Sequence, residues 1–274
     1  MAEVAIKFDD STAYERAIGR WSRAVAPVFL QWLSPPAGAR WLDVGCGTGV
    51  LTHTLLELSA PGSVIGIDAE AAQIAQAARG PAAGRAIFQV ADARSVPFVD
   101  ASFDIAASAL VLNFVAERSQ VMAEKRRVTR PGGSVAAYVW DFSDELSPSG
   151  PLRRAMRRFG LPVPAIPGTA ESRIDALVTL FEQTGLERVE TRTIEVCLAY
   201  SNFEDFWHAQ TPSYAPTTKI IASMTESERT RLVRAVRSEV PPGPGGTIEY
   251  FARANAIKAR APGTVRSRRV EKQA

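Results

Sequence analysis

The sequence predicts an α/β fold in which a mostly parallel sheet carries helices on both faces. Two observations lead to this prediction. Apolar, strand-like runs alternate with helical patterns from about residue 38 to about residue 195, as expected for parallel strands joined by helical crossovers. In addition, Gly45, Gly47 and Gly49 follow the first of these runs directly, at the point where the chain should turn from strand to helix.

Five apolar runs are expected to form the parallel part of the sheet. They are ARWLDVG (39–45), SVIGID (63–68), RAIFQVAD (85–92), FDIAASAL (103–110) and SVAAYVWD (134–141). The segments between them and after the last predict helices over residues 50–59, 70–79, 117–130 and 171–186. Because the fifth run is almost continuously apolar, we expect it to be buried on both faces.

The C-terminal part completes a seven-stranded, Rossmann-like sheet. Residues 187–200 alternate as a sixth strand, and residues 246–260 form a last extended run, which we expect to pair antiparallel with the sixth. The segments 142–170 and 199–246 follow the fifth and sixth strands. Ligands of open parallel sheets bind at the carboxyl ends of the strands, so both segments should fold over the pocket as a small cap.

The chain therefore divides into five predicted parts. They are an N-terminal helical lead-in (1–37), a ligand-binding core (38–198), a cap insertion (199–246), the last strand of the core sheet (247–261) and a disordered basic tail (262–274).

Composition limits the classes of function. The chain has 274 residues, 46% of them hydrophobic, and a net charge of only +3, and its basic residues do not form the concentrated stripe expected of a nucleic-acid-binding protein. No apolar run is long enough to span a membrane. Two cysteines and two histidines predict no disulfide framework and no metal site. No secretion signal is apparent at the start, and we expect a cytoplasmic protein.

The glycine cluster indicates that a ligand lies close to the backbone. A dinucleotide-binding turn would need a further glycine at position 50 or 52, where Val50 and Thr52 stand. This argues against NAD as the ligand. It agrees with a ligand that has no pyrophosphate to place at the helix N-terminus.

Two acidic residues strengthen this interpretation. Asp68 ends the second strand, where a carboxylate can accept hydrogen bonds from both hydroxyls of a ribose. Asp92 ends the third strand, where it can accept a hydrogen bond from an adenine amino group. A glycine turn and two acids at the ends of three consecutive strands predict a nucleoside-containing ligand.

The ordered set LDVGCGTGV, VIGIDAE, VADARSVPF, FDIAASALVLNF and VTRPGGSVAAYVW resembles the motifs of class I S-adenosylmethionine-dependent methyltransferases. The lead-in YERAIGRWSR is similar to that of a bacterial small-molecule group related to the ubiquinone and menaquinone biosynthesis methyltransferases. The resemblance implies S-adenosyl-L-methionine as the cofactor and makes residues 38–198 its binding core.

The resemblance also implies site residues. Asp43 and the backbone of Gly45, Cys46, Gly47 and Gly49 would lie along the methionine portion of the cofactor, with Asp43 acting through water or on the amino group.

The nucleoside portion would meet four residues. Asp68 would bind the ribose and Ala69 would touch the adenine face, while Asp92 and the N–H of Ala93 would contact the adenine edge.

Three further positions concern the amino group, the sulfonium and the acceptor. The Ser108 carbonyl and Leu110 would lie near the amino group and the sulfonium. Arg20, in the lead-in, is a candidate partner for the methionine carboxylate, or a solvated arginine. Many relatives end the FDIAASALVLNF motif with Leu-x-His, where this chain has Leu112-Asn113-Phe114, so any help that the histidine gives to deprotonation of the acceptor is absent.

Methyl transfer from a sulfonium is an in-line displacement that needs neither a protein nucleophile nor a metal, because alignment alone lowers the barrier. We therefore predict no catalytic residue. If the acceptor is a hydroxyl, a base would help, and His208 and Tyr14 lie in segments able to reach the pocket. The arginines at 153, 154, 157 and 158 either favour an anionic substrate or form a solvated face.

The sequence thus favours an enzyme that transfers a methyl group from S-adenosylmethionine to an O, N or C atom of a small molecule. One alternative is a regulatory or scaffold protein that binds S-adenosylmethionine or S-adenosylhomocysteine without turnover. A nicotinamide oxidoreductase is a third reading, disfavoured by the missing glycine. No motif of a nucleic-acid methylase is present, and the sequence sets neither the acceptor nor an oligomeric state.

Overall fold

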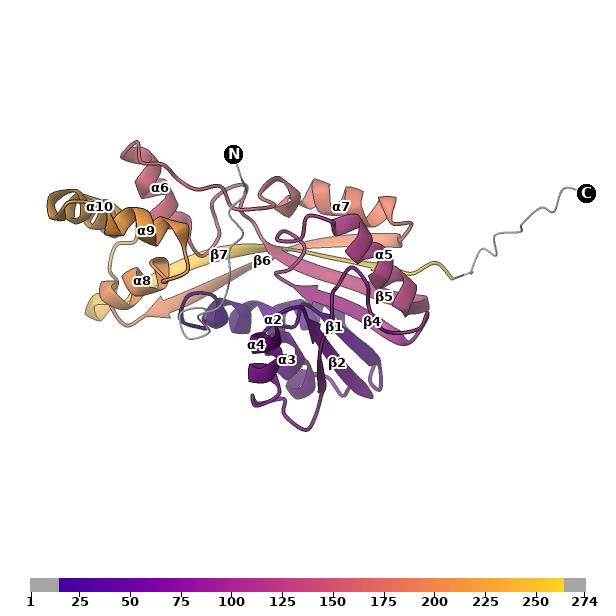
Figure 1. The fold of residues 1–274 in the computed structure, drawn as a ribbon. Helices are drawn as coiled ribbons and strands as arrows, with labels where there is room; N and C mark the ends of the chain where they lie inside the picture. The colour runs from indigo at the N-terminus through magenta and orange to yellow at the C-terminus, as the bar shows by residue number, and fades with distance from the viewer. Residues whose placement is uncertain (1–14, 264–274) are drawn as a thin grey trace, which may run out of the picture.

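The computed structural model describes residues 15–263. Tyr14 and residues 264–274 of the predicted tail lie outside the described residues. The centre of the molecule is a seven-stranded sheet with the strand order β3-β2-β1-β4-β5-β7-β6 (Figure 1). Strands β1 to β5 pair in parallel, whereas β7 pairs antiparallel with both β5 and β6. The predicted fold class is confirmed.

The strand boundaries agree closely with the apolar runs of the sequence. The strands are β1 (Arg40–Val44), β2 (Ser63–Asp68), β3 (Ile87–Val90), β4 (Phe103–Ala109), β5 (Thr129–Trp140), β6 (Glu187–Tyr200) and β7 (Ile248–Arg260). Two ends differ from the prediction. β3 ends at Val90, so Asp92 lies in the following loop, and β5 already begins at Thr129, because the Arg-Pro-Gly-Gly segment that was expected to close a helix is extended.

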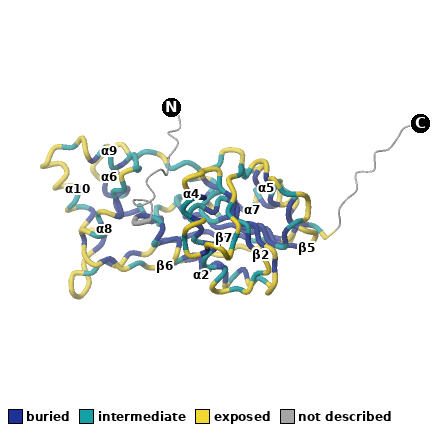
Figure 2. Tube along the Cα trace, turned by 60° about the horizontal axis from the view of Figure 1, so that its bottom comes forward, coloured by how far each residue is buried: buried dark blue, intermediate teal, exposed yellow. Residues whose placement is uncertain are grey.

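Helices cover both faces of the sheet. The helical elements of the central region are η1 (Glu15–Gly19), α2 (Arg20–Leu33), α3 (Val50–Leu58), α4 (Ala71–Ala77), α5 (Arg118–Val128), η2 (Ala170–Ser172) and α7 (Ile174–Gln183). One buried cluster joins α2 and α3 to the sheet, and a second joins α5 and α7 to it. The central strands β1, β4 and β5 are largely buried between them, whereas the edge strands β3 and β6 are largely exposed (Figure 2).

Strand β5 shows why the sheet needs cover on both sides. Successive side chains of a strand point to opposite faces. Tyr138 and Trp140 belong to the cluster with α2, whereas Val135 and Val139 belong to the cluster with α5 and α7. Residues 134–140 are all buried, as the near-continuous apolar sequence predicts.

The lead-in helix α2 packs on the sheet through aromatic side chains. The Trp21 ring lies edge-on to Trp140 on β5 and to Tyr250 on β7, at centroid distances of 5.9 Å in each case. About two turns further along, Phe29 packs on Tyr138 with its ring centroid 4.9 Å away. These contacts place the start of the helix beside the carboxyl end of β5.

Strands β6 and β7 run on beyond the rest of the sheet and carry a helical lobe (Figure 1). The lobe contains α6 (Gly150–Arg158), α8 (Phe203–Gln210), α9 (Pro216–Ala222), α10 (Glu226–Glu239) and η3 (Pro244–Gly246). Its sequence comes from the two segments predicted as a cap. Among residues 15–263, no helix is long and apolar enough to cross a membrane.

Candidate functional site

A cavity of about 650 Å³ lies at the carboxyl ends of the strands and is lined by residues from the sheet, from η1 before the lead-in helix and from the lobe. Its size lies in the usual range for small-molecule sites. At one end the lining comes from the carboxyl ends of β1, β2 and β3 and the loops after them; at the other it comes from β5 and the lobe, and the loop after β4 reaches from the first end to Phe114 at the second. We call these the turn end and the lobe end.

The three glycines of the first turn have different roles. All have positive φ angles, of 72°, 54° and 85° for Gly45, Gly47 and Gly49. A Cβ atom on Gly45 would lie 2.4 Å from Val111, and one on Gly49 would lie 3.2 Å from Phe88. A Cβ atom on Gly47 would meet nothing within 4 Å, and Gly47 lines the cavity. Only Gly47 therefore leaves space that a ligand can use.

The carboxylate of Asp68 lines the cavity and is held by backbone donors. Its Oδ2 accepts a hydrogen bond from the Gly47 N–H at 2.9 Å, and its Oδ1 accepts one from the Glu70 N–H at 2.9 Å. Each carboxylate oxygen can accept a further hydrogen bond. Asp68 thus fixes the glycine turn and presents acceptors to the cavity.

Asp43 lies behind the turn rather than on the cavity surface. It is 1% exposed, and its Oδ2 accepts a hydrogen bond from the Thr52 hydroxyl at 2.8 Å. Its Oδ1 has no hydrogen-bond partner among the described residues. Burial raises the pKa of Asp43 to about 6, and the nearby Asp68 adds to the effect.

Asp92, Ala69 and Ala93 also line the cavity. Asp92 is already bound by its neighbour, because the Arg94 guanidinium donates to it at 2.7 Å and the Arg94 N–H donates at 2.8 Å. These hydrogen bonds lower the pKa of Asp92. A ligand at Asp92 would share the carboxylate with Arg94.

Leu110 lines the cavity in a strained conformation. Its φ is 62°, which is rare for a bulky side chain because Cβ crowds the backbone. The Leu110 N–H donates to the Tyr138 carbonyl at 2.8 Å, which holds the residue in place. Backbone strain of this kind often occurs at binding sites.

Four other predicted positions do not line the cavity, and their contacts with a cofactor stay predictions. The Arg20 guanidinium donates to Asp205 at 3.1 Å and to the Ala199 carbonyl at 2.9 Å. It thereby fastens α2 to the lobe instead of facing a ligand carboxylate.

Ser108, Cys46 and Gly49 are the other three. The buried Ser108 hydroxyl accepts a hydrogen bond from Lys125 at 2.8 Å, beneath the sheet. The Cys46 side chain packs toward Gly66 of β2, and burial raises the pKa of its thiol. Gly49 begins α3 and is enclosed by Phe88 and Ala77.

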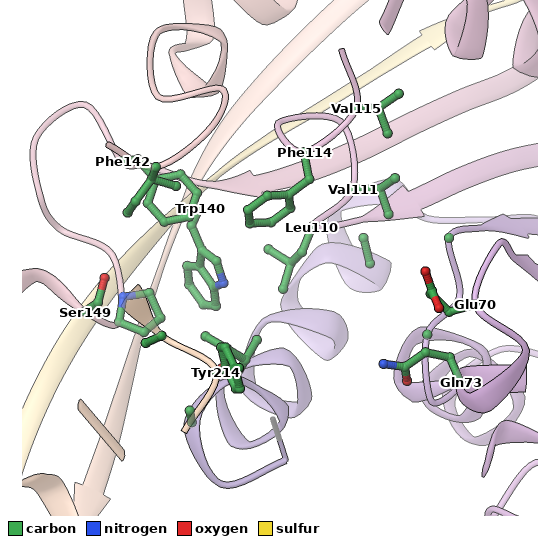
Figure 3. Close-up of a pocket in the computed structure, with 18 of the residues that line it drawn as sticks. Glu70, Gln73, Leu110, Val111, Phe114, Val115, Trp140, Phe142, Ser149 and Tyr214 are labelled. Atoms are coloured by element: carbon green, nitrogen blue, oxygen red, sulfur yellow. The ribbon is translucent and has the colours of Figure 1, made fainter. Parts of the chain in front are cut away.

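The lobe end is apolar and was largely missed from sequence. Phe114, Trp140, Phe142 and Tyr214 line it, and they gather around one open space (Figure 3). Trp140 is the last residue of β5, so its place at a strand end was the available signal. The others lie in loops whose course depends on the tertiary fold.

Of four aromatic residues in the predicted cap insertion, Tyr214 lines the cavity, whereas Phe203, Phe206 and Trp207 pack within the lobe. His208, the suggested base, is not among the lining residues either. Within the described part of the chain, no group of histidine, cysteine or acidic residues has the arrangement of a metal site.

Residues 42–137 match a family model described as a methyltransferase domain. The chain is 32% identical over 129 residues to the ubiquinone/menaquinone biosynthesis C-methyltransferase of Geobacter sulfurreducens, covering 45% of this chain and 48% of that one. It is also 32% identical over 148 residues to the 27-O-demethylrifamycin SV methyltransferase of Amycolatopsis mediterranei, covering 52% and 51%. The chain thus spans about half the length of these curated relatives.

A solved structure supports the fold. Phosphoethanolamine N-methyltransferase 2 of Haemonchus contortus, in complex with S-adenosyl-L-methionine, matches with a TM-score of 0.56 and 19% identity, over 92% of this chain and 56% of that chain. At this identity the likeness shows the fold alone.

The turn end fits the cofactor that this fold binds. Gly47 leaves open space at the cavity, Asp68 presents acceptor lone pairs there, and Asp43 has an unpartnered buried oxygen just behind. A ribose offers two hydroxyl donors and an amino acid portion offers an ammonium group, which match these acceptors. The residues present therefore agree with S-adenosylmethionine.

Proposed function

We propose that this chain, whose residues 42–137 form a methyltransferase domain, transfers a methyl group from S-adenosylmethionine to a small-molecule acceptor. One observation carries the proposal: a single cavity joins the glycine turn and Asp68 at one end to an apolar space at the other. Such a cavity can hold a cofactor and an acceptor in contact, which is what direct transfer between two bound molecules requires.

At the turn end, we assign binding roles to the cavity-lining members of the predicted set. Asp68 accepts hydrogen bonds from the ribose, and its contacts with the Gly47 and Glu70 N–H groups hold its carboxylate in position. Ala69 and Ala93 contact the adenine, with Asp92 at its edge. The backbone of Gly45 and Gly47 lies along the methionine portion.

Asp43 acts in this proposal from behind the turn. Its hydrogen bond to Thr52 orients the carboxylate, and its free oxygen attracts a cationic or hydroxyl donor through the turn or through water. The side chains of Arg20, Ser108 and Cys46 have no direct contact with the ligand in this proposal, whereas the backbone of Cys46 and Gly49 and the Ser108 carbonyl keep their predicted roles.

When bound, S-adenosylmethionine supplies a methyl group activated by the positive charge on sulfur. The residues of the chain then have to exclude water and align the acceptor. Leu110, Val111, Phe114 and Trp140 provide an apolar wall between the two ends of the cavity. The positive charge on sulfur disperses as the methyl group moves. A dry apolar wall therefore favours the transition state over the ground state, in which that charge is localised.

The position of the lobe supports our proposal that the methyl acceptor is a small molecule. Residues from 142–170 and from 199–246 line the lobe end together, as expected for segments that fold over a pocket. The division of the chain into five parts also stays a proposal. The described cysteines are both free, one of them exposed, which supports our proposal of a reducing, cytoplasmic location.

The test is a transfer assay with S-adenosylmethionine labelled in its methyl group and a metabolite extract. The proposal predicts label in a new small molecule with wild-type protein and much less label with an Asp68→Ala variant at the same limiting cofactor concentration. Saturable binding of S-adenosylhomocysteine with no transfer to any component would instead support a regulatory or scaffold protein. Absence of binding would refute both.

A further inference from the structure

The lobe end of the cavity is apolar but contains three polar side chains that are almost completely buried. Trp140 is 2% exposed, Gln210 is 3% exposed and Arg153 is 8% exposed, and all three line the cavity. The Trp140 Nε1 and the Gln210 Oε1 have no hydrogen-bond partner among the described residues. In Figure 3 the Trp140 ring borders the open space beside Leu110.

The orientation of Gln210 is set by the protein. Its Nε2 donates to the Pro148 carbonyl at 2.7 Å, which leaves Oε1 as the free acceptor. A buried acceptor without a partner costs free energy. A ligand with a hydroxyl or N–H group would remove that cost.

Arg153 has little compensation for its charge. Its Nη1 donates to the Pro164 carbonyl at 2.9 Å, and its Nε lies 3.8 Å from the Glu145 carboxylate, which is too far for a hydrogen bond. Glu145 is also the ion-pair partner of Arg157. One carboxylate is therefore shared by two guanidinium groups, and Arg153 has the weaker contact.

The other arginines of α6 point elsewhere. Arg154 and Arg158 both pair with Glu239 at the end of α10, at 2.9 Å and 2.5 Å. The described lining residues between positions 140 and 217 include only one charged side chain, Arg153. The acidic lining residues lie at the end of β2 or in the loops after β2, β3 and β4, and none of them belongs to the lobe.

A buried guanidinium with donors left over is costly unless an anion pairs with it. Planar, paired N–H donors match a carboxylate or a similar oxyanion. The flat aromatic side chains around it suit a flat apolar body.

We propose that the methyl acceptor is a flat, apolar molecule with one acidic group, that Arg153 binds this group, and that Gln210 accepts a hydrogen bond from the body of the molecule. The inference rests on the proposed function and specifies its substrate class. Arg153 is a specificity-determining residue in this proposal, not a catalytic one. Its neighbours on α6 differ from it, because each of them has a close carboxylate partner in Glu145 or Glu239.

Two fluorescent probes that differ by an acidic group test this directly. They are 1-anilinonaphthalene-8-sulfonate and its uncharged analogue N-phenyl-1-naphthylamine, titrated into wild-type protein saturated with S-adenosylhomocysteine. The variants are Arg153→Gln, which removes the charge, and Arg153→Lys, which keeps it. Arg158→Gln is the matched control, because it removes a charge from the same helix outside the cavity.

Loss of the Arg153 charge should weaken binding of the sulfonate about tenfold or more, as expected for a buried ion pair, and change binding of the uncharged probe less than about twofold. Arg153→Lys should recover part of the affinity, and Arg158→Gln should leave both probes unchanged. Equal weakening of both probes, an unchanged sulfonate affinity, an equal effect of Arg158→Gln, or no sulfonate binding to wild type would overturn the inference.

Binding of S-adenosylhomocysteine is measured on every variant. Unchanged affinity shows that Arg153→Gln is folded and that the turn end is intact. If wild type fails to bind it, the proposed function fails. If it binds and the probes do not discriminate, the inference about the acceptor fails alone.

Discussion

Replacing single glycines of the first turn by alanine separates packing from ligand binding. Gly84, which lies between α4 and β3 and does not line the cavity, is the control. Gly45, Gly47 and Gly84 all have positive φ, so alanine should cost about 1–2 kcal/mol of backbone strain at each position. At Gly45 the new methyl group would also lie 2.4 Å from Val111, which should add about 1–3 kcal/mol of overpacking. At Gly47 and Gly84 it would meet nothing within 4 Å.

The two measurements are urea denaturation and calorimetric titration with S-adenosylhomocysteine. Gly45→Ala should lose more free energy of unfolding than the other two variants. Adding Val111→Ala to the Gly45→Ala variant should restore part of that loss. Gly47→Ala should be as stable as Gly84→Ala but bind the ligand about tenfold or more weakly, because Gly47 lines the cavity and Gly84 does not.

Two results would refute this reasoning. One is a Gly47→Ala variant that binds S-adenosylhomocysteine as tightly as Gly84→Ala does. The other is a Gly45→Ala variant no less stable than Gly47→Ala, since the contact with Val111 would then be relieved without cost.

Three further predictions concern buried and paired charges. Asp68→Ala should weaken binding of S-adenosylhomocysteine by about 1.5–3 kcal/mol, the usual range for hydrogen bonds to a charged group. Asp92→Ala should have a smaller effect, because Arg94 already binds the Asp92 carboxylate. Calorimetric titration measures both, and equal losses of affinity would contradict the assignment. Arg20→Ala should leave ligand affinity unchanged, because Arg20 pairs with Asp205; a loss of affinity in a folded variant would restore the sequence prediction. Burial lowers the pKa of Lys125 from 10.5 to about 7. Between these pH values the unfolded chain therefore binds more protons than the folded one. The free energy of unfolding should rise with pH in this range by at most about 1.4 kcal/mol per pH unit. Lys125→Met should flatten this slope in denaturation experiments at pH 7 to 10, and an unchanged slope would show that Lys125 is not its source.

The fold was predictable because the apolar runs are long and regular. The near-continuous run of β5 and the alternation of β6 are visible without any structure, since burial on two faces or on one face leaves a direct trace in the sequence. The end of β3 at Val90 was less predictable, because a short edge strand has few apolar residues to mark where pairing stops.

The turn end of the site was predictable for a similar reason. Asp68 directly follows an apolar strand, and a strand end has a defined position in a parallel sheet. The sequence does not show the partner of a side chain whose contacts depend on the tertiary fold. Arg20 lies within reach of the cavity in sequence terms, yet Asp205, 185 positions away, is its partner, and no local pattern encodes that contact.

The lobe end shows the same limit more strongly. Arg153 could be recognised from sequence only as one of four similar arginines. Its burial depends on the loop that carries Pro164 and on the position of Glu145, which Arg157 also binds. Distant segments that meet only in the folded protein decide which arginine faces the cavity.

A crystal structure of the protein with S-adenosylhomocysteine would test the central claim most directly. The account predicts the ribose hydroxyls within hydrogen-bond distance of the Asp68 carboxylate, the ligand backbone passing over Gly47, and the sulfur facing the apolar space beside Leu110 and Trp140. A ligand bound elsewhere, or no ligand in crystals soaked at saturating concentration, would contradict it.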